Sequence, residues 1–216
     1  MLWLLENKEA LSFAEPERFL PLLPEAPRVR ILSMKHEPGQ VQSLLAWLLL
    51  RHAYAQEYGG ALPEVRAALY GKPEFTGQDM PQFNLSHCPL AIACALDGSP
   101  VGVDVQPLHR YDPKLRRVLS EPERVWVEEA DSDARFTVLW TRKEAYGKAM
   151  GWGIGYDMTQ TDFSGDSAEP LRCDGGLLRT VAREGYFLSA CAREVLPLRT
   201  VSSDELFQNG EDTEYV

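Results

Sequence analysis

Residues 101–106 read VGVDVQ, and the alternation of residue types in this stretch indicates a β-strand. Successive side chains of a strand point to opposite faces, so the three valines would share one face, and Asp104 and Gln106 the other. The valine face predicts the buried side of a sheet. On the opposite face, two oxygen-bearing side chains would project together, with their Cα atoms about 7 Å apart.

Asp104 and Gln106 have two interpretations. Mg²⁺ takes oxygen ligands, usually one or two carboxylates together with water and substrate phosphate. Asp104 would then be the charged ligand, and Gln106 would add a neutral carbonyl oxygen. The alternative is an acid at the end of a strand that faces solvent, which is the more common situation for an aspartate taken alone.

Strand-like runs also occur on both sides of this stretch. Residues 90–96 precede it, and the turn residues at 97–100 predict a β-hairpin that joins the two strands. Further strands are expected at 177–181 and 186–192. The triplet Ala-Cys-Ala occurs in the first and last of these runs, which is a weak echo compatible with an internal duplication.

Helical spacing of apolar residues predicts helices between the strands. The longest is expected at 39–58, ending at two glycines, and another at 134–150, ending at Gly151. Residues 113–129 predict one or two helices, and residues 62–69 a short one. Beyond Arg199 the chain carries acids without bases, which predicts a solvated tail.

Composition narrows the classes of partner. The 216 residues carry a formal net charge of -10, which argues against sequence-independent binding of nucleic acid, because that binding needs a basic surface. The longest apolar run, 44–50, is far shorter than the ~20 residues that cross a bilayer. The first ten residues lack the layout of a signal peptide, so we expect a cytoplasmic protein that binds neither nucleic acid nor membrane.

Three residues of the predicted helix 134–150 form a line. Trp140, Glu144 and Lys148 are spaced four apart and would therefore lie on one helix face. An ordinary surface ion pair between Glu144 and Lys148, worth about 0.2–0.5 kcal/mol, is one interpretation. The indole in the same line favours a partly buried face, where a solvated pair is less expected.

Basic and polar residues suited to phosphate binding lie upstream. Lys72 stands in a GKP loop, and Ser86 and His87 come from the sequence FNLSHC. Residues 28–52 form a locally basic stretch that includes Lys35. Phosphate groups need such donors, although each base could equally be part of a solvated surface. Ser86 and His87 do not indicate a hydrolase, because neighbours on a strand point to opposite faces.

Taken in order, four motifs resemble the signature set of the Sfp-type 4′-phosphopantetheinyl transferases. They are GKP at 71–73, FNLSHC at 83–88, GVDVQ at 102–106 and FTVLWTRKEAYGKAMGWGI at 136–154. The resemblance spans roughly residues 70–155. It implies an α+β fold of two similar halves that form a pseudo-dimer, each a small antiparallel sheet packed with helices, with coenzyme A in the cleft between them.

On this resemblance we expect an N-terminal half at 1–105, a C-terminal half at 106–202 and an acidic tail at 203–216. The resemblance also implies roles for residues. The expected metal ligands are Asp104, Glu144 and Gln106, the expected catalytic residues are Glu144 and Lys148, and the expected contacts to the coenzyme are Lys72, Ser86, His87 and, for its 3′-phosphate, Lys35. Gln106 departs from the family, whose third metal position is often acidic.

The implied reaction is magnesium-dependent transfer of the 4′-phosphopantetheine arm of coenzyme A to a serine of an apo acyl or peptidyl carrier protein. Adenosine 3′,5′-bisphosphate would leave, and the enzyme would act as a monomer. One alternative is a module that binds coenzyme A or a carrier protein with weak or no transfer, because the acid at position 106 is missing. Another is an unrelated structural protein with chance ion pairs.

Overall fold

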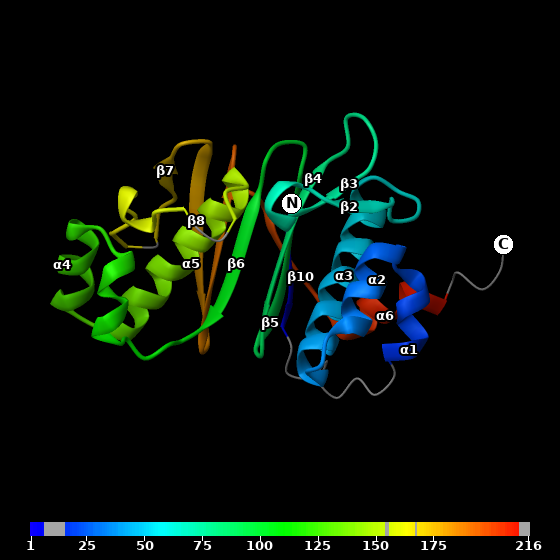
Figure 1. Ribbon diagram of the computed structural model, residues 1–216, viewed down its shortest axis with the longest axis horizontal. Helices are drawn as coiled ribbons and strands as arrows, with labels where there is room; N and C mark the ends of the chain where they lie inside the picture. The colour runs from blue at the N-terminus through cyan, green and yellow to red at the C-terminus, as the bar shows by residue number, and fades with distance from the viewer. Residues whose placement is uncertain (7–15, 154–155, 167, 212–216) are drawn as a thin grey trace.

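The computed structural model describes residues 1–6, 16–153, 156–166 and 168–211. Strands occupy the middle of the molecule and helices lie at both ends (Figure 1). Within the described residues the strands form two four-stranded sheets and one two-stranded sheet. The α+β class expected from the sequence is confirmed.

The first sheet contains strands from both ends of the chain. Its order is β10-β1-β5-β4. Its members are β1 (Leu2–Glu6), β4 (Gln82–Cys88), β5 (Ala91–Asp97) and β10 (Leu198–Val201). Strand β1 pairs in parallel with β10 and antiparallel with β5, while β4 and β5 form an antiparallel hairpin.

Helix α3 lies on the first sheet, and three shorter helices pack against it. The helices on this side are α1 (Pro16–Phe19), α2 (Glu25–Ser33), α3 (Glu37–Glu57) and α6 (Ser203–Glu211), with the 3₁₀ turn η2 at Leu20–Leu22. The helix predicted at 39–58 is confirmed as α3, whose Leu44 and Leu45 are fully buried. Among the described residues, no helix has the length and apolar character needed to cross a bilayer.

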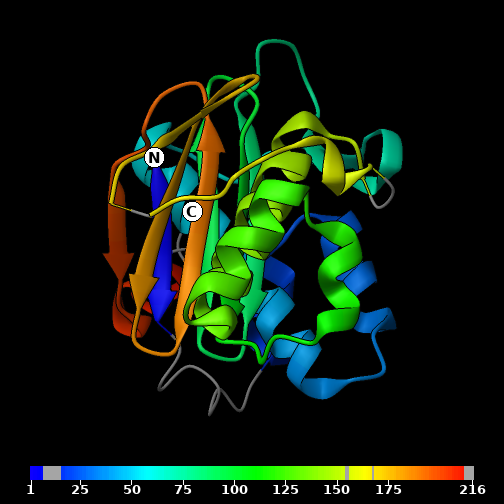
Figure 2. The same cartoon turned by 90° about the vertical axis from the view of Figure 1, so that its left-hand side faces the viewer.

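The second sheet is antiparallel throughout, in the order β6-β9-β8-β7. Its members are β6 (Gly102–Pro107), β7 (Leu171–Cys173), β8 (Gly176–Arg183) and β9 (Tyr186–Ala192). The accompanying helices are α4 (Glu121–Glu129) and α5 (Ser132–Met150), with 3₁₀ turns η4 (Pro113–Val118) and η5 (Met158–Gln160). Figure 2 shows α5 lying across the face of this sheet.

Gly102 allows α5 to lie directly on β6. A Cβ atom at this position would stand 2.0 Å from the carbonyl oxygen of Ala145 and 2.4 Å from the nitrogen of Ala149. Any side chain here would push the helix away from the strand. The strand that carries Asp104 and the helix that carries Glu144 are therefore held close together by a residue without a side chain.

The hairpin predicted over residues 90–106 is wrong. Strand β5 pairs with β1 and β4, whereas β6 pairs with β9, so the turn at 97–100 joins two different sheets. The reason is that both strands bury a face of small apolar side chains, and these faces pack against each other. This core between the sheets includes Ala91, Ala93 and Ala95 from β5, Val101, Val103 and Val105 beside them, and Leu188, Ala190 and Ala192 from β9.

The short helix expected at 62–69 is also wrong. Strand β2 (Val65–Ala67) forms there instead and pairs with β3 (Pro73–Phe75). Val65 is buried in the core beneath α3, and a β-branched residue favours the extended backbone. The turn η3 (Leu69–Gly71) connects the two strands, with Tyr70 and Gly71 at φ values of 63° and 81°.

The solvated tail expected beyond Arg199 is wrong for residues 200–211. Thr200 and Val201 complete β10, and residues 203–211 form α6. Leu206 of that helix is only 3% exposed, because it packs into the core around α3. The burial of apolar residues such as Leu206 therefore decides the structure of this segment, despite its acidic composition. Residues 212–216 lie outside the described residues.

Candidate functional site

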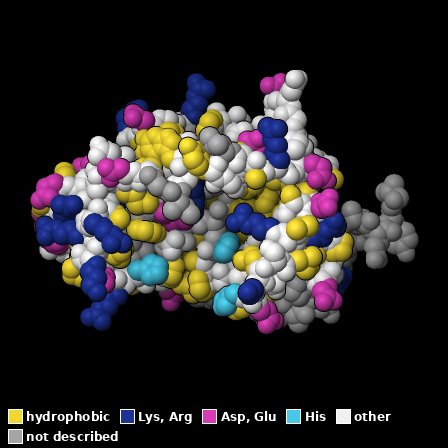
Figure 3. Space-filling model, in the orientation of Figure 1, with side chains coloured by type: hydrophobic (Ala, Val, Ile, Leu, Met, Phe, Trp, Pro, Cys, Tyr) yellow, Lys and Arg dark blue, Asp and Glu magenta, His cyan; other side chains and the backbone are white. Residues whose placement is uncertain are grey.

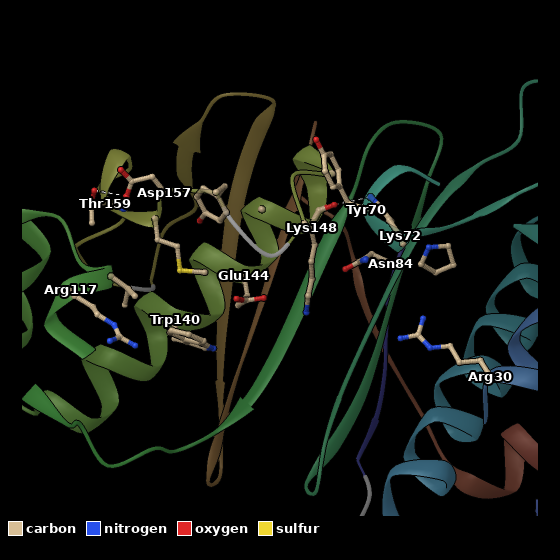
Figure 4. Close-up of a pocket in the computed structure, with 18 residues that line it drawn as sticks. Arg30, Tyr70, Lys72, Asn84, Arg117, Trp140, Glu144, Lys148, Asp157 and Thr159 are labelled. Carbon is tan, nitrogen blue, oxygen red and sulfur yellow. Dashed lines mark hydrogen bonds between the residues drawn. The ribbon is translucent and has the colours of Figure 1, made fainter. Parts of the chain in front are cut away.

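A cavity of about 830 Å³ lies between the elements of the first sheet and those of the second. Its lining on one side comes from α2, η3 and β4, and on the other from η4, α5 and the segment that follows α5 (Figure 4). Figure 3 shows basic and histidine side chains near a hollow in the middle of this face. Residues from three of the four sequence motifs line the cavity. They include Lys72, Asn84, Glu144 and Lys148.

Asp104 is the central acid of the site and is 2% exposed. Its Oδ1 accepts hydrogen bonds from Ser86 Oγ at 2.9 Å and from Lys148 Nζ at 2.5 Å. Its Oδ2 accepts a hydrogen bond from Gln106 Nε2 at 3.2 Å. The carboxylate is therefore held in place by one residue from the first sheet, one from its own strand and one from α5.

Glu144 faces the cavity from α5, one turn from Trp140 and one turn from Lys148 (Figure 4). Within the described part of the chain, its carboxylate has no hydrogen-bond or ion-pair partner. Burial raises the pKa of Glu144 above its ordinary value, the charge of Lys148 lowers it, and the charge of Asp104 raises it further. Two carboxylates thus lie close enough to interact, and this arrangement favours a proton or a cation between them.

The two lysines of the cavity are each partly engaged. Lys148 Nζ lies 3.3 Å from the carbonyl oxygen of Val103 and also binds Asp104. Lys72 Nζ donates to the carbonyl oxygens of Val101 at 3.0 Å and of Lys148 at 2.8 Å. Burial lowers the pKa of Lys72. An ammonium group has three donors, so each lysine keeps one that has no partner among the described residues and can serve a ligand.

Asp104 and the remaining residues predicted from the sequence lie around the cavity instead of lining it. Ser86 is buried behind Asp104, and Gln106 presents its amide nitrogen to that carboxylate. His87 is exposed, with Nδ1 3.0 Å from Gln42 Oε1. Lys35 is exposed beyond the end of α2. Neither His87 nor Lys35 belongs to the lining residues.

Several cavity residues were missed by the sequence reasoning. Arg30 and Arg117 lie on opposite sides of the cavity, and Figure 4 shows Lys148 and Asn84 between them. Arg30 belongs to the basic stretch 28–52, so its residue type was a usable signal. Asn84 lies within FNLSHC but has no charge to single it out. Nothing in the sequence pattern indicated Arg117, because its approach to α5 depends on tertiary packing.

A metal ion would find two carboxylates here. In the ranges that the structure covers, no three His, Cys, Asp or Glu side chains gather as a metal site. Asp104 and Glu144 are the two acids, and their electrostatic coupling suits a hard cation with oxygen ligands. Gln106 fits only if its amide turns, because its nitrogen now faces Asp104 and its Oε1 lies 3.4 Å from His109 Nε2.

The segment that follows α5 is fixed to the back of that helix. Arg142, 1% exposed, donates from Nη1 to the carbonyl oxygens of Phe163 at 2.7 Å and Gly165 at 2.8 Å. Burial lowers the pKa of Arg142 to about 10, and the charges of Asp166 and Glu123 oppose this. The cavity wall at 156–159 therefore belongs to a well-anchored segment.

Comparison with known proteins gives one consistent family. Residues 100–191 match the family model described as the 4′-phosphopantetheinyl transferase superfamily. The 4′-phosphopantetheinyl transferase gsp of Aneurinibacillus migulanus is 30% identical over 167 residues, which cover 70% of this chain and 68% of that protein. The 4′-phosphopantetheinyl transferase Sfp of Bacillus subtilis is 27% identical over 150 residues, covering 67% of each.

Two further similarities were found. Another 4′-phosphopantetheinyl transferase from Bacillus subtilis is 26% identical over 195 residues, covering 84% of this chain and 87% of that protein. Among solved structures, the holo-[acyl-carrier-protein] synthase of Thermotoga maritima aligns with a TM-score of 0.30 at 21% identity. That alignment covers 42% of this chain and 60% of the other.

Proposed function

The chain belongs to the 4′-phosphopantetheinyl transferase superfamily, and from this we infer that it transfers the 4′-phosphopantetheine arm of coenzyme A to a serine of an apo acyl or peptidyl carrier protein. Adenosine 3′,5′-bisphosphate is the second product. One structural observation supports this proposal independently of the family relationship. Lys148 and Glu144 line the cavity, and Lys148 pairs with Asp104, a buried acid 44 residues away in sequence that does not itself belong to the lining.

We propose that the enzyme depends on Mg²⁺, held by Asp104 and Glu144. Burial raises the pKa of Glu144 most, and the charge of Asp104 adds to this; a cation between the two acids would relieve their repulsion. Gln106 would contribute a neutral oxygen after rotation of its amide. When bound, Mg²⁺ supplies charge neutralisation and orientation of the diphosphate.

The cavity lysines are the proposed diphosphate contacts. Lys72 and Lys148 each have an unused donor, and Lys148 can steady negative charge on the bridging oxygen as it leaves. Ser86, His87 and Lys35 stay predictions as phosphate contacts. The hydroxyl of Ser86 already donates to Asp104, and Arg30, which lines the cavity, is better placed than Lys35.

The proposed chemistry needs one proton acceptor. The serine hydroxyl of the carrier protein attacks the β-phosphorus of coenzyme A, so an oxygen–phosphorus bond forms and the bond to the bridging oxygen breaks. Glu144 accepts the serine proton, and the negative charge passes to the leaving bisphosphate. The raised pKa of Glu144 makes this carboxylate a better base than an ordinary surface glutamate.

The finer organisation is part of the same proposal. We propose that residues 1–105 and 106–202 are two similar halves that form a pseudo-dimer; residues 203–211, expected as part of an acidic tail, form α6 instead. Support comes from the two four-stranded sheets, although β10 lies in the first sheet with β1. The cytoplasmic location and the monomeric state stay predictions.

A panel assay tests the proposed function. The protein is incubated with coenzyme A, Mg²⁺ and apo carrier proteins from fatty-acid, polyketide and peptide synthesis, and each carrier is weighed by mass spectrometry. Addition of the phosphopantetheine arm to at least one carrier is the expected result. A chelator should abolish it, and restored Mg²⁺ should recover it.

The alternative is a binding module with weak or no transfer; it rests on the neutral Gln106 alone, and the transferase relatives do not favour it. A magnesium titration separates the two. If no arm is added even at high Mg²⁺ while coenzyme A still binds, the binding module is correct. Recovery of transfer in a Gln106→Glu variant would then identify the missing charge as the cause.

A further inference from the structure

The two large sheets are joined edge to edge by side chains. Strand β6 is the last strand of its sheet, so its second edge has no backbone ladder. The amide N–H of Val103 donates to Asn84 Oδ1 at 2.8 Å, and the N–H of Val105 donates to Ser86 Oγ at 3.2 Å. We call these two contacts between β4 and β6 the seam. Without them, two buried backbone donors would lack partners.

Asn84 differs from Ser86 in the hydrogen-bond donors that remain available to a ligand. The hydroxyl of Ser86 gives its single hydrogen to Asp104 and accepts from Val105, so it has no donor for a ligand. Asn84 Oδ1 accepts from Val103, which fixes the orientation of the amide, because only the oxygen can accept. Both hydrogens of the Asn84 amide nitrogen therefore have no partner among the described residues.

The position of Asn84 supplies the second observation. Its side chain is 6% exposed, and yet it lines the cavity. Figure 4 shows it between Lys72 and Lys148, the two ammonium-bearing residues of the cavity. An amide N–H pair that opens onto a cavity donates to whatever fills the cavity, either water or a ligand. Beside two ammonium groups, the ligand atom that fits best is an anionic oxygen.

We propose that Asn84 is a positioning residue that donates from Nδ2 to a phosphate oxygen of the bound nucleotide while its Oδ1 holds β6. This inference rests on the proposed function and assigns Asn84 a role in it. Because Val103 directly precedes Asp104, the same amide ties the phosphate group to the strand that carries the central acid. Ligand binding and the alignment of the two sheets are thereby coupled.

The test measures coenzyme A binding without chemistry, by titration calorimetry in magnesium-free buffer. Asn84→Asp keeps an oxygen for Val103 and replaces the donor with a second acceptor. We expect its dissociation constant for coenzyme A to rise by at least about 10-fold to 100-fold, because one hydrogen bond to a charged group is lost and the new carboxylate repels the phosphate. Its melting temperature should stay near that of the wild type.

Two further variants keep the result interpretable. Asn84→Ala removes both functions, so it should show the weaker binding together with a lower melting temperature. Gln82→Ala is the control on the same strand: Gln82 lies outside the cavity lining, so coenzyme A affinity should stay within about 3-fold.

The outcomes separate this inference from the proposed function. If the wild type binds coenzyme A and Asn84→Asp binds it equally well, the inference is overturned and the proposed function stands. If Gln82→Ala weakens binding as much as the Asn84 variants do, the loss does not come from the Asn84 donor and the inference is again overturned. If the wild type does not bind coenzyme A at all, both the inference and the proposed function are overturned.

Discussion

Helix α5 contributes lysines to two ion pairs that differ in how completely they are enclosed. Lys143 pairs with Glu123 at 2.8 Å, and both side chains are 0% exposed. Lys148 pairs with Asp104 at 2.5 Å, with 29% of the lysine side chain exposed and 2% of the aspartate. We call the first the closed pair and the second the open pair. Only the open pair borders the cavity.

In the closed pair, both charged groups also form hydrogen bonds with surrounding backbone groups. Lys143 Nζ also donates to the carbonyl oxygens of Met158 and Thr161. Glu123 accepts from the backbone N–H groups of Ser120 and Phe163. A buried charge with all partners present holds a fold in one arrangement. The closed pair therefore anchors the segment after α5 to α4.

In the open pair, some donors and acceptors near the two charges have no hydrogen-bond partner among the described residues. Lys148 has a free donor, and Asp104 lies near Glu144, whose carboxylate lacks a partner within the described chain. Satisfying all these groups requires something from outside the chain. The same residue types on one helix therefore have two roles. Where all their hydrogen-bond and ion-pair partners lie within the protein, they stabilise the fold; where partners are missing, they form a binding site.

The largest expected effect concerns the carboxylate beside the open pair. Glu144→Gln removes the proposed base without changing side-chain volume, so kcat for arm transfer should fall by about 10²-fold to 10⁴-fold. The unfolding free energy should change little, because no contact is lost. Mass spectrometry of the carrier protein gives the rate. Glu128→Gln, an exposed acid on α4, is the control, and near-normal turnover of Glu144→Gln would contradict the base assignment.

The closed pair should show its effect in stability. Lys143→Met leaves Glu123 charged and fully buried without its partner, which should lower the unfolding free energy by about 3–5 kcal/mol. Urea denaturation followed by circular dichroism measures it. The double variant Lys143→Met with Glu123→Gln should recover much of the loss, because no charge then remains buried and the amide oxygen can still accept from a backbone N–H. A single variant as stable as the wild type would refute the scaffold role.

The sequence could predict which residues carry charge in this region but not how they pair. Spacing along one helix suggested Glu144 with Lys148, and the structure instead gives Lys148 to Asp104 and Lys143 to Glu123. Local periodicity reports only which side chains share a helix face. Both observed pairs join α5 to another element, so they depend on how the elements pack.

Fold prediction shows the same limit. Helices α3 and α5 and the strands near 90–106 and 177–192 follow from local patterns, and all of them form. The partners of β5 and β6 were predicted wrongly, because a turn between two strands does not reveal whether they share a sheet. Lys72 and Asp104 were named from motifs, whereas Asn84 and Arg117 became visible only through the cavity they line.

A smaller stability effect is expected for the open pair. Lys148→Met leaves Asp104 with its hydrogen bonds from Ser86 and Gln106, so the unfolding free energy should fall by only about 1.5–3 kcal/mol, the value of one hydrogen bond to a charged group. Addition of Mg²⁺ should stabilise this variant more than the wild type, because the ammonium no longer competes for the carboxylate. Thermal melts with and without Mg²⁺ check both statements, and a loss equal to that of Lys143→Met would erase the distinction between the pairs.

The smallest expected effect is a change in the pKa of His87. His87 keeps solvent-exposed surface, but partial desolvation by the residues packed around its ring lowers this pKa most; the charges of Lys148 and then Arg30 lower it further, and Asp104 opposes them. Lys148→Met should therefore raise the pKa of His87 toward its ordinary value, whereas Lys114→Met, an exposed control on η4, should leave it unchanged. Proton NMR of the imidazole across pH 5–8 measures this, in the range about the ordinary histidine pKa.

The sign of the linked stability follows from the direction of that shift. A histidine whose pKa is lowered in the folded protein binds its proton more readily when unfolded, so its contribution is present above the ordinary pKa and is lost as the pH falls through the folded value. Wild-type stability should thus fall on acidification across this window, and Lys148→Met should reduce the part due to His87. Because His87 is exposed, the change should be a fraction of the loss expected for either ion pair. An unshifted His87 resonance in Lys148→Met would mean that the open pair does not act on its surroundings through its charge.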